Sequence, residues 1–336
     1  LEVASPSLLR LVEEISRPRV VRERPQELPA QPPTEPQVQP PAQPQEPAPG
    51  SVHFASGHIV GRADARARLE QLLDQSVRLI SVTGMGGIGK TAFVHSRLHE
   101  LSARCDGRLY EVDCRGHAVD AGTAAATLLH TIAVDLRIRL AGDQPVFDQV
   151  RAALAGAPAC LILDNFETLD AAAPTVAQLV AALPALTVIT TTRRALRLRD
   201  EAIIELHGLD TRPGGDGWSE AAAFFVQRVR QERTGFALTQ TDRQLVESIC
   251  RRLGGHPLAI ELAAAQADFY GLAELREIVG RDATPLAAPY QDAPAEHQSL
   301  AALLEGMWSR LSPAAGTVLA QLSVFASAFT REDMQA

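Results

Sequence analysis

The chain has 336 residues, enough for two domains, and 46% hydrophobic with 21% charged residues is typical of a globular protein. Its net charge of −8 argues against binding nucleic acid or anionic lipid through the chain as a whole. No apolar run approaches the length of a membrane span, and Glu2, Glu13 and Glu14 occupy the place of a signal peptide's apolar core. We therefore expect a cytoplasmic protein with no membrane partner.

Two residue types give information by their scarcity. The four cysteines lie without CxxC spacing, which favours reduced thiols over a disulfide framework or a metal site; they are Cys105, Cys114, Cys160 and Cys250. Of the 32 basic residues only Lys90 is a lysine, so this position has a reason to resist replacement by arginine.

The N-terminal part of the chain has two predicted segments. Residues 1–17 contain a short amphipathic helix at 8–15, which we expect to be the remnant of an upstream helical domain because it is too short to be stable alone. Residues 1–15 also resemble the end of a bacterial transcriptional activator domain. Residues 18–57 are a Pro/Gln-rich linker, whose ten prolines between Pro25 and Pro49 favour an extended tether. An SH3-type ligand is the alternative, although no basic residue flanks a PxxP in this tract.

From about residue 58, short apolar strands alternate with helical stretches, which indicates βαβ units around a parallel sheet. Strands are expected at 78–83, 109–113, 159–164, 187–191 and 202–206, and helices at 90–101, 123–137 and 146–154. After about Trp218 only helices are expected, at 220–231, 242–253, 257–267, 271–279 and 300–325. We predict an α/β domain over 58–206, a helical domain over 207–290 and the start of a third domain over 291–336.

The segment 84–91, GMGGIGKT, fits the phosphate-loop pattern GxxxxGK[ST] between a predicted strand and a predicted helix. Glycines there let several backbone N–H groups converge on phosphate oxygens at a helix N-terminus. Lys90 would meet the β- and γ-phosphates, and Thr91 would supply a hydroxyl to Mg²⁺. The predicted phosphate-binding residues are Gly84, Met85, Gly86, Gly87, Ile88, Gly89, Lys90, Thr91 and Ala92.

The same residues also spell GxGxxG through Gly84, Gly86 and Gly89, the dinucleotide fingerprint of a Rossmann fold. Glu111 or Asp113 then follows at the end of the next strand, where that fold places its ribose-binding acid. A Rossmann helix needs no Lys-Thr pair at its start, so we favour the phosphate loop.

Two further strand ends complete the predicted site. The apolar strand 159–164 ends in Asp164, a carboxylate suited to hold Mg²⁺ beside the γ-phosphate. Asn165 follows where many ATPases carry a second acid, so the general base is Glu167 or is absent, and hydrolysis is expected to be slow. The strand 187–191 leads to Arg193 and Arg194, of which we choose Arg193 as the γ-phosphate sensor.

The order GMGGIGKT, LILDNFE, VITTTRR and GGHPLAIEL resembles the NB-ARC type of STAND ATPase over residues 58–336. This resemblance implies that Val60, Gly61 and Arg62 contact adenine and that Pro257 closes over the nucleotide. His256 departs from the leucine usual in that family. Read without the resemblance, residues 254–257 are equally well an ordinary helix–helix turn. Residues 308–325 resemble the start of a winged helix.

The resemblance implies a switch in which ADP holds a closed form and ATP with Mg²⁺ favours an open one. It also implies sensor repeats C-terminal to this chain, an effector domain N-terminal to it, homo-oligomers on activation and DNA contact only through other domains. A bacterial signalling or transcriptional regulator is the expected setting. Two alternatives stay open: an ADP-binding scaffold without turnover, and a Rossmann NAD-binding oxidoreductase.

Overall fold

The computed structural model describes residues 59–116, 120–214, 217–232, 239–283, 286–287, 298–309 and 311–323. The helix predicted within 1–17, the linker predicted over 18–57 and the end of the helix predicted over 300–325 lie outside these residues. Within the described part of the chain, no helix combines the length and the apolar character needed to cross a membrane.

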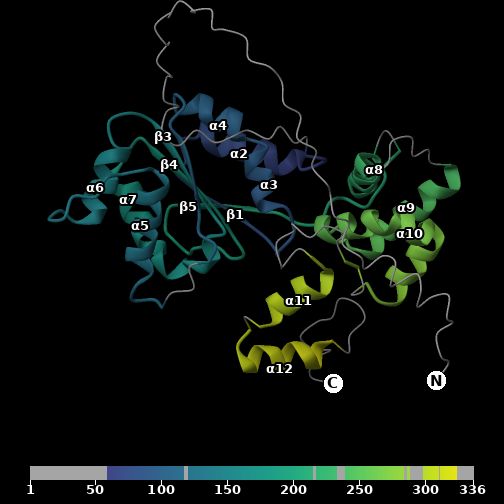
Figure 1. Cartoon of the computed structure of the whole chain (residues 1–336). Coiled ribbons are helices and arrows are strands. Elements are labelled where there is room, and N and C mark those ends of the chain that lie inside the picture. The colour runs from purple at the N-terminus through teal and green to yellow at the C-terminus, as the bar shows by residue number, and fades with distance from the viewer. Residues whose placement is uncertain are drawn as a thin grey trace, which may run out of the picture. The chain divides into compact units, whose positions relative to one another are not determined.

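The predicted parallel sheet is confirmed, with five strands in the order β2-β3-β4-β1-β5 (Figure 1). The strands are β1 (Leu79–Thr83), β2 (Leu109–Asp113), β3 (Ala159–Asp164), β4 (Leu186–Thr192) and β5 (Glu201–Glu205). Every residue of β1 and β3 is buried, as expected for strands covered on both faces. Because all pairs are parallel, the carboxyl ends of the strands meet at one edge of the sheet.

Helices cover both faces of the sheet, and two separate apolar clusters result (Figure 1). One cluster combines strand residues with α5 (Ala124–Asp135), α6 (Val146–Leu154) and α7 (Ala173–Ala182). The other combines them with α2 (Ala63–Asp74), α3 (Lys90–His95) and α4 (Leu98–Arg104). The architecture is therefore a three-layer α/β sandwich around the predicted parallel sheet.

The single helix predicted over 90–101 is wrong, because the chain forms α3 and α4 with a break between them. At the end of α3, the Ser96 hydroxyl donates a hydrogen bond to the Phe93 carbonyl over 2.6 Å. A serine that bonds to nearby backbone competes with the helical hydrogen-bond ladder. The chain therefore turns at Ser96 and Arg97 before the second helix begins.

After β5 the named elements of the described residues are all helices, in agreement with the prediction. They are α8 (Glu220–Glu232), α9 (Gln240–Arg252), α10 (Pro257–Arg281), α11 (Leu300–Trp308) and α12 (Pro313–Leu322). The two helices predicted at 257–267 and 271–279 run on as α10 with a kink at Gly271, where φ is +66°. A glycine adopts this conformation at little cost.

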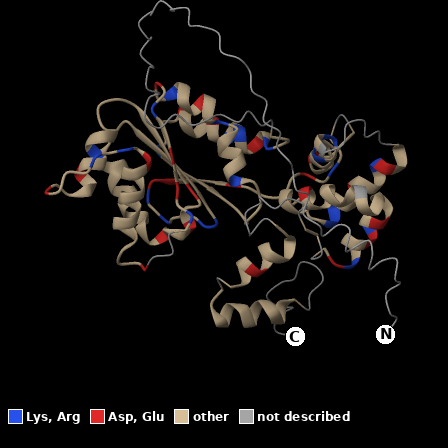
Figure 2. Ribbon diagram, viewed as in Figure 1, with Lys and Arg blue, Asp and Glu red and all other residues tan. Residues whose placement is uncertain are grey.

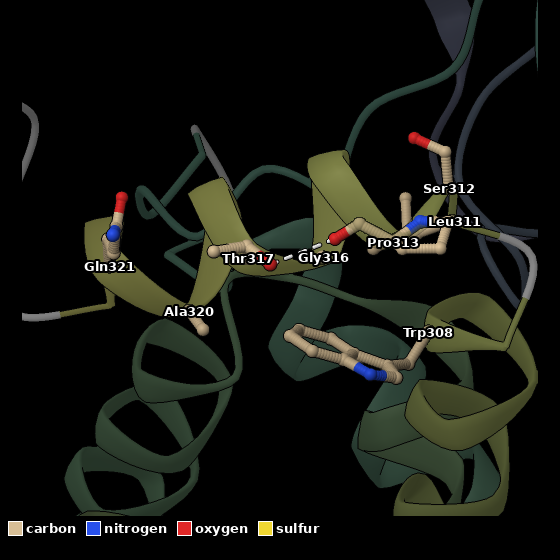
Figure 3. A pocket seen from close by; sticks show the side chains of 8 residues that line it. All are labelled: Trp308, Leu311, Ser312, Pro313, Gly316, Thr317, Ala320 and Gln321. Atoms are coloured by element: carbon tan, nitrogen blue, oxygen red, sulfur yellow. Dashed lines mark hydrogen bonds between the residues drawn. The ribbon is translucent and has the colours of Figure 1, made fainter.

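The helix predicted over 300–325 is interrupted, because Ser312 caps a new helix and Pro313 occupies its first position. Leu303 of α11 belongs to the apolar cluster of α8, α9 and α10. Glu305 is the one charged residue in α11 and α12 (Figure 2). An open pocket lies between these two helices, with the Trp308 ring beside Gly316 of α12 (Figure 3).

The strand order separates the two interpretations of the glycine loop. In a Rossmann fold the second strand lies beside the first, so that its terminal acid reaches the ligand on the glycine loop. Here β3 and β4 lie between β1 and β2, which sets β1 and β2 roughly 14 Å apart at ordinary strand spacing. Glu111 and Asp113 on β2 are therefore not placed to bind a ribose on this loop.

Candidate phosphate-binding site

The glycine loop connects β1 to α3 at the carboxyl edge of the sheet. Gly84 directly follows β1 and lies close to the backbone after β5, since a Cβ on Gly84 would lie 2.6 Å from the Leu206 carbonyl oxygen. Gly84, Gly87 and Gly89 all have positive φ values, which glycine adopts without strain. This strand–loop–helix arrangement is the context that the GxxxxGK[ST] pattern requires.

Lys90, the single lysine, is 8% exposed and folds back over the loop. Its ammonium donates hydrogen bonds to the carbonyls of Gly84 over 3.0 Å and Met85 over 3.1 Å. Burial lowers the pKa of Lys90, and the nearby carboxylate of Glu167 opposes that shift. A compact ammonium with three donors fits this curl, whereas a forked guanidinium does not.

Thr91 and Asp164, the two predicted magnesium ligands, come together from α3 and β3. The Thr91 hydroxyl donates to Oδ1 of Asp164 over 2.7 Å. A hydroxyl and a carboxylate oxygen side by side are the donor types that Mg²⁺ prefers, with phosphates and water completing its shell. These two residues therefore fit the predicted magnesium ligands.

Two neighbours fix the Asp164 carboxylate. Oδ2 accepts a hydrogen bond from the Asn165 side-chain amide over 2.6 Å. Oδ1 accepts a second bond from the buried Thr191 hydroxyl, which in turn accepts one from the Asn165 backbone N–H over 2.9 Å. Asn165, at the position where many ATPases carry a second acid, therefore orients the Asp164 carboxylate in this structure.

Thr191 is a residue that sequence reasoning missed. Its signal was the run of three threonines at the end of β4, which are buried in a position where strands normally carry apolar side chains. Since β4 lies between β1 and β3, the Thr191 hydroxyl can reach Asp164 on the neighbouring strand.

The predicted sensor and the predicted base lie together. The Arg193 guanidinium donates through Nε to Oε1 of Glu167 over 3.0 Å, and the two side chains are 19% and 15% exposed. The second oxygen of Glu167, Oε2, is buried and has no hydrogen-bond partner. An unpaired buried carboxylate oxygen is costly unless a ligand or water completes it, so Glu167 is suited to meet a bound group.

Arg62 contacts the loop from the segment before α2. Its guanidinium donates to the Ile88 carbonyl over 2.8 Å and to the His207 carbonyl. Burial lowers the pKa of Arg62, and Glu220 opposes that shift. Gly61 has φ of +72°, a conformation that glycine adopts without strain and other residues rarely adopt. The predicted adenine contact of Val60, Gly61 and Arg62 stays a prediction.

The start of α10 reaches the loop from the helical part of the chain. The His256 ring nitrogen Nε2 is 2.9 Å from the Gly86 carbonyl oxygen, and the Leu258 N–H donates to the Gly87 carbonyl over 3.2 Å. Pro257, predicted to close over a nucleotide, is the first residue of this helix. The structure therefore brings residues 256–258 to the phosphate loop.

The four cysteines are free, as predicted from their spacing, and all four are buried. Burial raises the pKa of Cys114 to about 12.

No family model matches this chain. It is 27% identical over 287 residues to an uncharacterised protein of Mycobacterium tuberculosis, covering 84% of this chain and 70% of that protein. It is 28% identical over 265 residues to a protein of the same organism that is provisionally named an HTH-type transcriptional regulator, covering 78% of this chain. The match spans 28% of that regulator.

Solved structures give weaker likenesses. A STAND protein with a tetratricopeptide repeat sensor from Pyrococcus horikoshii has a TM-score of 0.40 at 17% identity, over 86% of this chain and 38% of that one. The ORC1 protein of Aeropyrum pernix, in complex with DNA, has a TM-score of 0.42 at 14% identity, over 80% of this chain and 73% of that one.

The assignment of the fold therefore depends on the chain's own geometry. A parallel sheet carries the loop 84–91 between β1 and α3, and Thr91 and Asp164 meet at its carboxyl edge. By this motif and topology, the α/β part of the chain has the P-loop NTPase fold.

Proposed function

We propose that the chain is a nucleotide-dependent switch that binds ADP or ATP with Mg²⁺. The observation that carries the proposal is the meeting of Thr91 with Asp164, 73 residues apart in sequence, beside the single lysine on its glycine loop. Phosphates would lie on the loop, with Lys90 at the β- and γ-phosphates. Bound Mg²⁺ would neutralise phosphate charge, held by Thr91 and Asp164.

Hydrolysis in this proposal is slow, and Glu167 is its base. Glu167 is held by Arg193 through one oxygen while the other is unpartnered, so a water could donate its proton to Oε2. When a γ-phosphate is bound, Arg193 would turn to it and release Glu167. The pair therefore couples sensing of the γ-phosphate to release of the base.

The contacts of α10 support a switch over a static scaffold. Residues 256–258 bond to loop carbonyls, so a change in the loop on exchange of ADP for ATP bears directly on the helical part. A ligand shifts such an equilibrium only by its difference in affinity for the two forms. We propose that ADP favours this bonded form and that ATP with Mg²⁺ disfavours it.

The relatives favour a regulatory setting. One of them is named provisionally as an HTH-type transcriptional regulator, and this chain spans about a quarter of it. We propose that the chain acts in the cytoplasm as the NB-ARC-like ATPase part of a bacterial signalling or transcriptional regulator. Sensor repeats, an effector domain, the rest of a winged helix and any DNA contact would belong to other parts, and activation would produce homo-oligomers.

The test is calorimetric titration of the chain with ATP and Mg²⁺, comparing wild type with Lys90→Met. We expect micromolar or tighter binding by wild type and none by the variant, since the ammonium is lost from the phosphates. Retained affinity in Lys90→Met would refute the assignment. Multiple-turnover phosphate release that is lost in Asp164→Ala would separate a slow ATPase from a scaffold without turnover.

A further inference from the structure

Five successive carbonyls of the glycine loop are hydrogen-bonded, and three of them are bonded by groups from distant parts of the chain. Lys90 binds the first two, at Gly84 and Met85. The other three bonds come from His256 to Gly86, from the Leu258 N–H to Gly87 and from Arg62 to Ile88. The carbonyls of Gly86, Gly87 and Ile88 are therefore held by residues outside the loop.

Among these side chains, His256 also caps the N-terminus of a helix. Its Nδ1 accepts a hydrogen bond from the Ala259 N–H over 3.4 Å and so caps the N-terminus of α10. A carbonyl can only accept, so Nε2 must be the protonated nitrogen that donates to Gly86. One neutral tautomer therefore satisfies both bonds at once.

The bond to Gly86 also sets the direction of an amide in the loop. The peptide that carries the Gly86 carbonyl carries the Gly87 N–H, and in a trans peptide the two point to opposite sides. The chain has no cis peptide bonds in its described residues. Holding the carbonyl outward at His256 therefore turns the Gly87 N–H away from α10, to the side where a phosphate would lie.

We propose that His256 is a positioning residue for phosphate binding, which orients the Gly87 N–H through the Gly86 carbonyl and ties α10 to the loop. This inference rests on the proposed function of the loop and adds a residue to it. A leucine at this position could neither cap the helix nor bond to the loop. His256 also packs tightly against the loop, since a Cβ on Gly87 would lie 2.9 Å from Cε1 of His256.

Two substitutions separate the two bonds of His256. In His256→Asn the short amide keeps a helix cap but does not reach the Gly86 carbonyl. In His256→Gln the amide nitrogen has about the reach of Nε2 and can donate to that carbonyl. Thr239→Ala is the control, because it removes the cap of α9 without touching the loop.

The experiment measures ADP affinity of the full chain by calorimetry, with thermal unfolding of each variant alongside. We expect His256→Asn to weaken ADP binding about three- to tenfold, the usual effect of one lost hydrogen bond, and to lower the melting temperature by about 2–4 °C. We expect His256→Gln to bind within about twofold of wild type. Thr239→Ala should lower the melting temperature and leave ADP affinity unchanged.

The outcomes separate the two proposals. Equal ADP affinity in wild type and His256→Asn, with binding lost in Lys90→Met, would overturn the role of His256 and leave the nucleotide site standing. Equal loss of affinity in His256→Asn and His256→Gln would also overturn it. Failure of wild type to bind ADP, or ATP with Mg²⁺, would overturn both.

Discussion

The contact between α10 and the glycine loop can be broken by adding one methyl group at Gly87. A Cβ there would lie 2.9 Å from both Cε1 of His256 and Cβ of Leu258, closer than real atoms approach. Because Leu258 Cβ is fixed to the helix backbone, the start of α10 must move away. Gly87→Ala should therefore lose the bonds at Gly86 and Gly87, each stabilising by about 1 kcal/mol.

The backbone strain of the same substitution needs a matched control. Gly87 has φ of +69°, and an alanine in that region costs about 1–2 kcal/mol. Gly107 has φ of +79° and nothing within 4 Å of its added Cβ, so Gly107→Ala carries the strain without the clash. We expect Gly107→Ala to lose about 1–2 kcal/mol and Gly87→Ala about 3–4 kcal/mol.

The assay is urea unfolding followed by circular dichroism, with both variants beside wild type. The difference between the two variants isolates the contact of α10 with the loop, since their backbone strain is similar. Losses that agree within about 0.5 kcal/mol would refute the reasoning that this contact stabilises the fold.

Three further predictions follow from the site. Thr191→Val should lower the free energy of unfolding by about 1–3 kcal/mol, because Asp164 and Asn165 lose a buried hydrogen-bond partner. Thr187→Val on the same strand should change the free energy of unfolding by less than about 0.5 kcal/mol. Equal effects of the two substitutions in urea unfolding would contradict this prediction. A double-mutant cycle with Glu167→Gln and Arg193→Gln should give a coupling of about 1–3 kcal/mol, against about 0.5 kcal/mol or less for the exposed Arg104–Asp74 pair. In NMR titrations, His256 should have a pKa below 6.5 through burial near Arg62 and Lys90, and His95 one above 6.5 through its hydrogen bond to Glu111. The stabilising contribution of the His256 contact should then be lost as pH falls from about 6.5 through the lowered pKa of His256. The contribution of the His95–Glu111 pair should be lost as pH rises through the raised pKa of His95. Measured pKa values of both histidines on the same side of 6.5 would contradict the structure.

Much of the α/β part was predictable, because its signals are local. Buried parallel strands are short apolar runs, and the loop at 84–91 is a fixed pattern of glycines before Lys90 and Thr91. The carboxylate at Asp164 follows such a run directly. These features depend on neighbours in sequence, which a single sequence shows.

The parts that sequence reasoning missed depend on strand order or on local competition. Thr191 reaches Asp164 only because β4 lies beside β3, and no periodicity reveals that order. The break at Ser96 comes from one side-chain hydrogen bond. Two helices were not predicted: α7 is apolar around most of its surface, and α2 buries only Leu69 and Leu72, so neither shows a clear stripe.

The role of His256 was also hidden, since its partner Gly86 lies 170 positions away. From the sequence alone, GGHP fits an ordinary helix–helix turn as well as a segment that closes over a nucleotide. In both interpretations the glycines end one helix and the proline begins the next. The fold brings this turn to the loop, and the chemistry of the imidazole ring then gives it two bonds.

The most direct test of a nucleotide site is the identity of whatever the purified chain carries. The chain should be denatured, and any released small molecule identified by chromatography and mass. We predict ADP at close to one per chain, as a closed resting form held by ADP requires. Release of NAD, or an empty protein that also fails to take up ATP with Mg²⁺, would contradict the account.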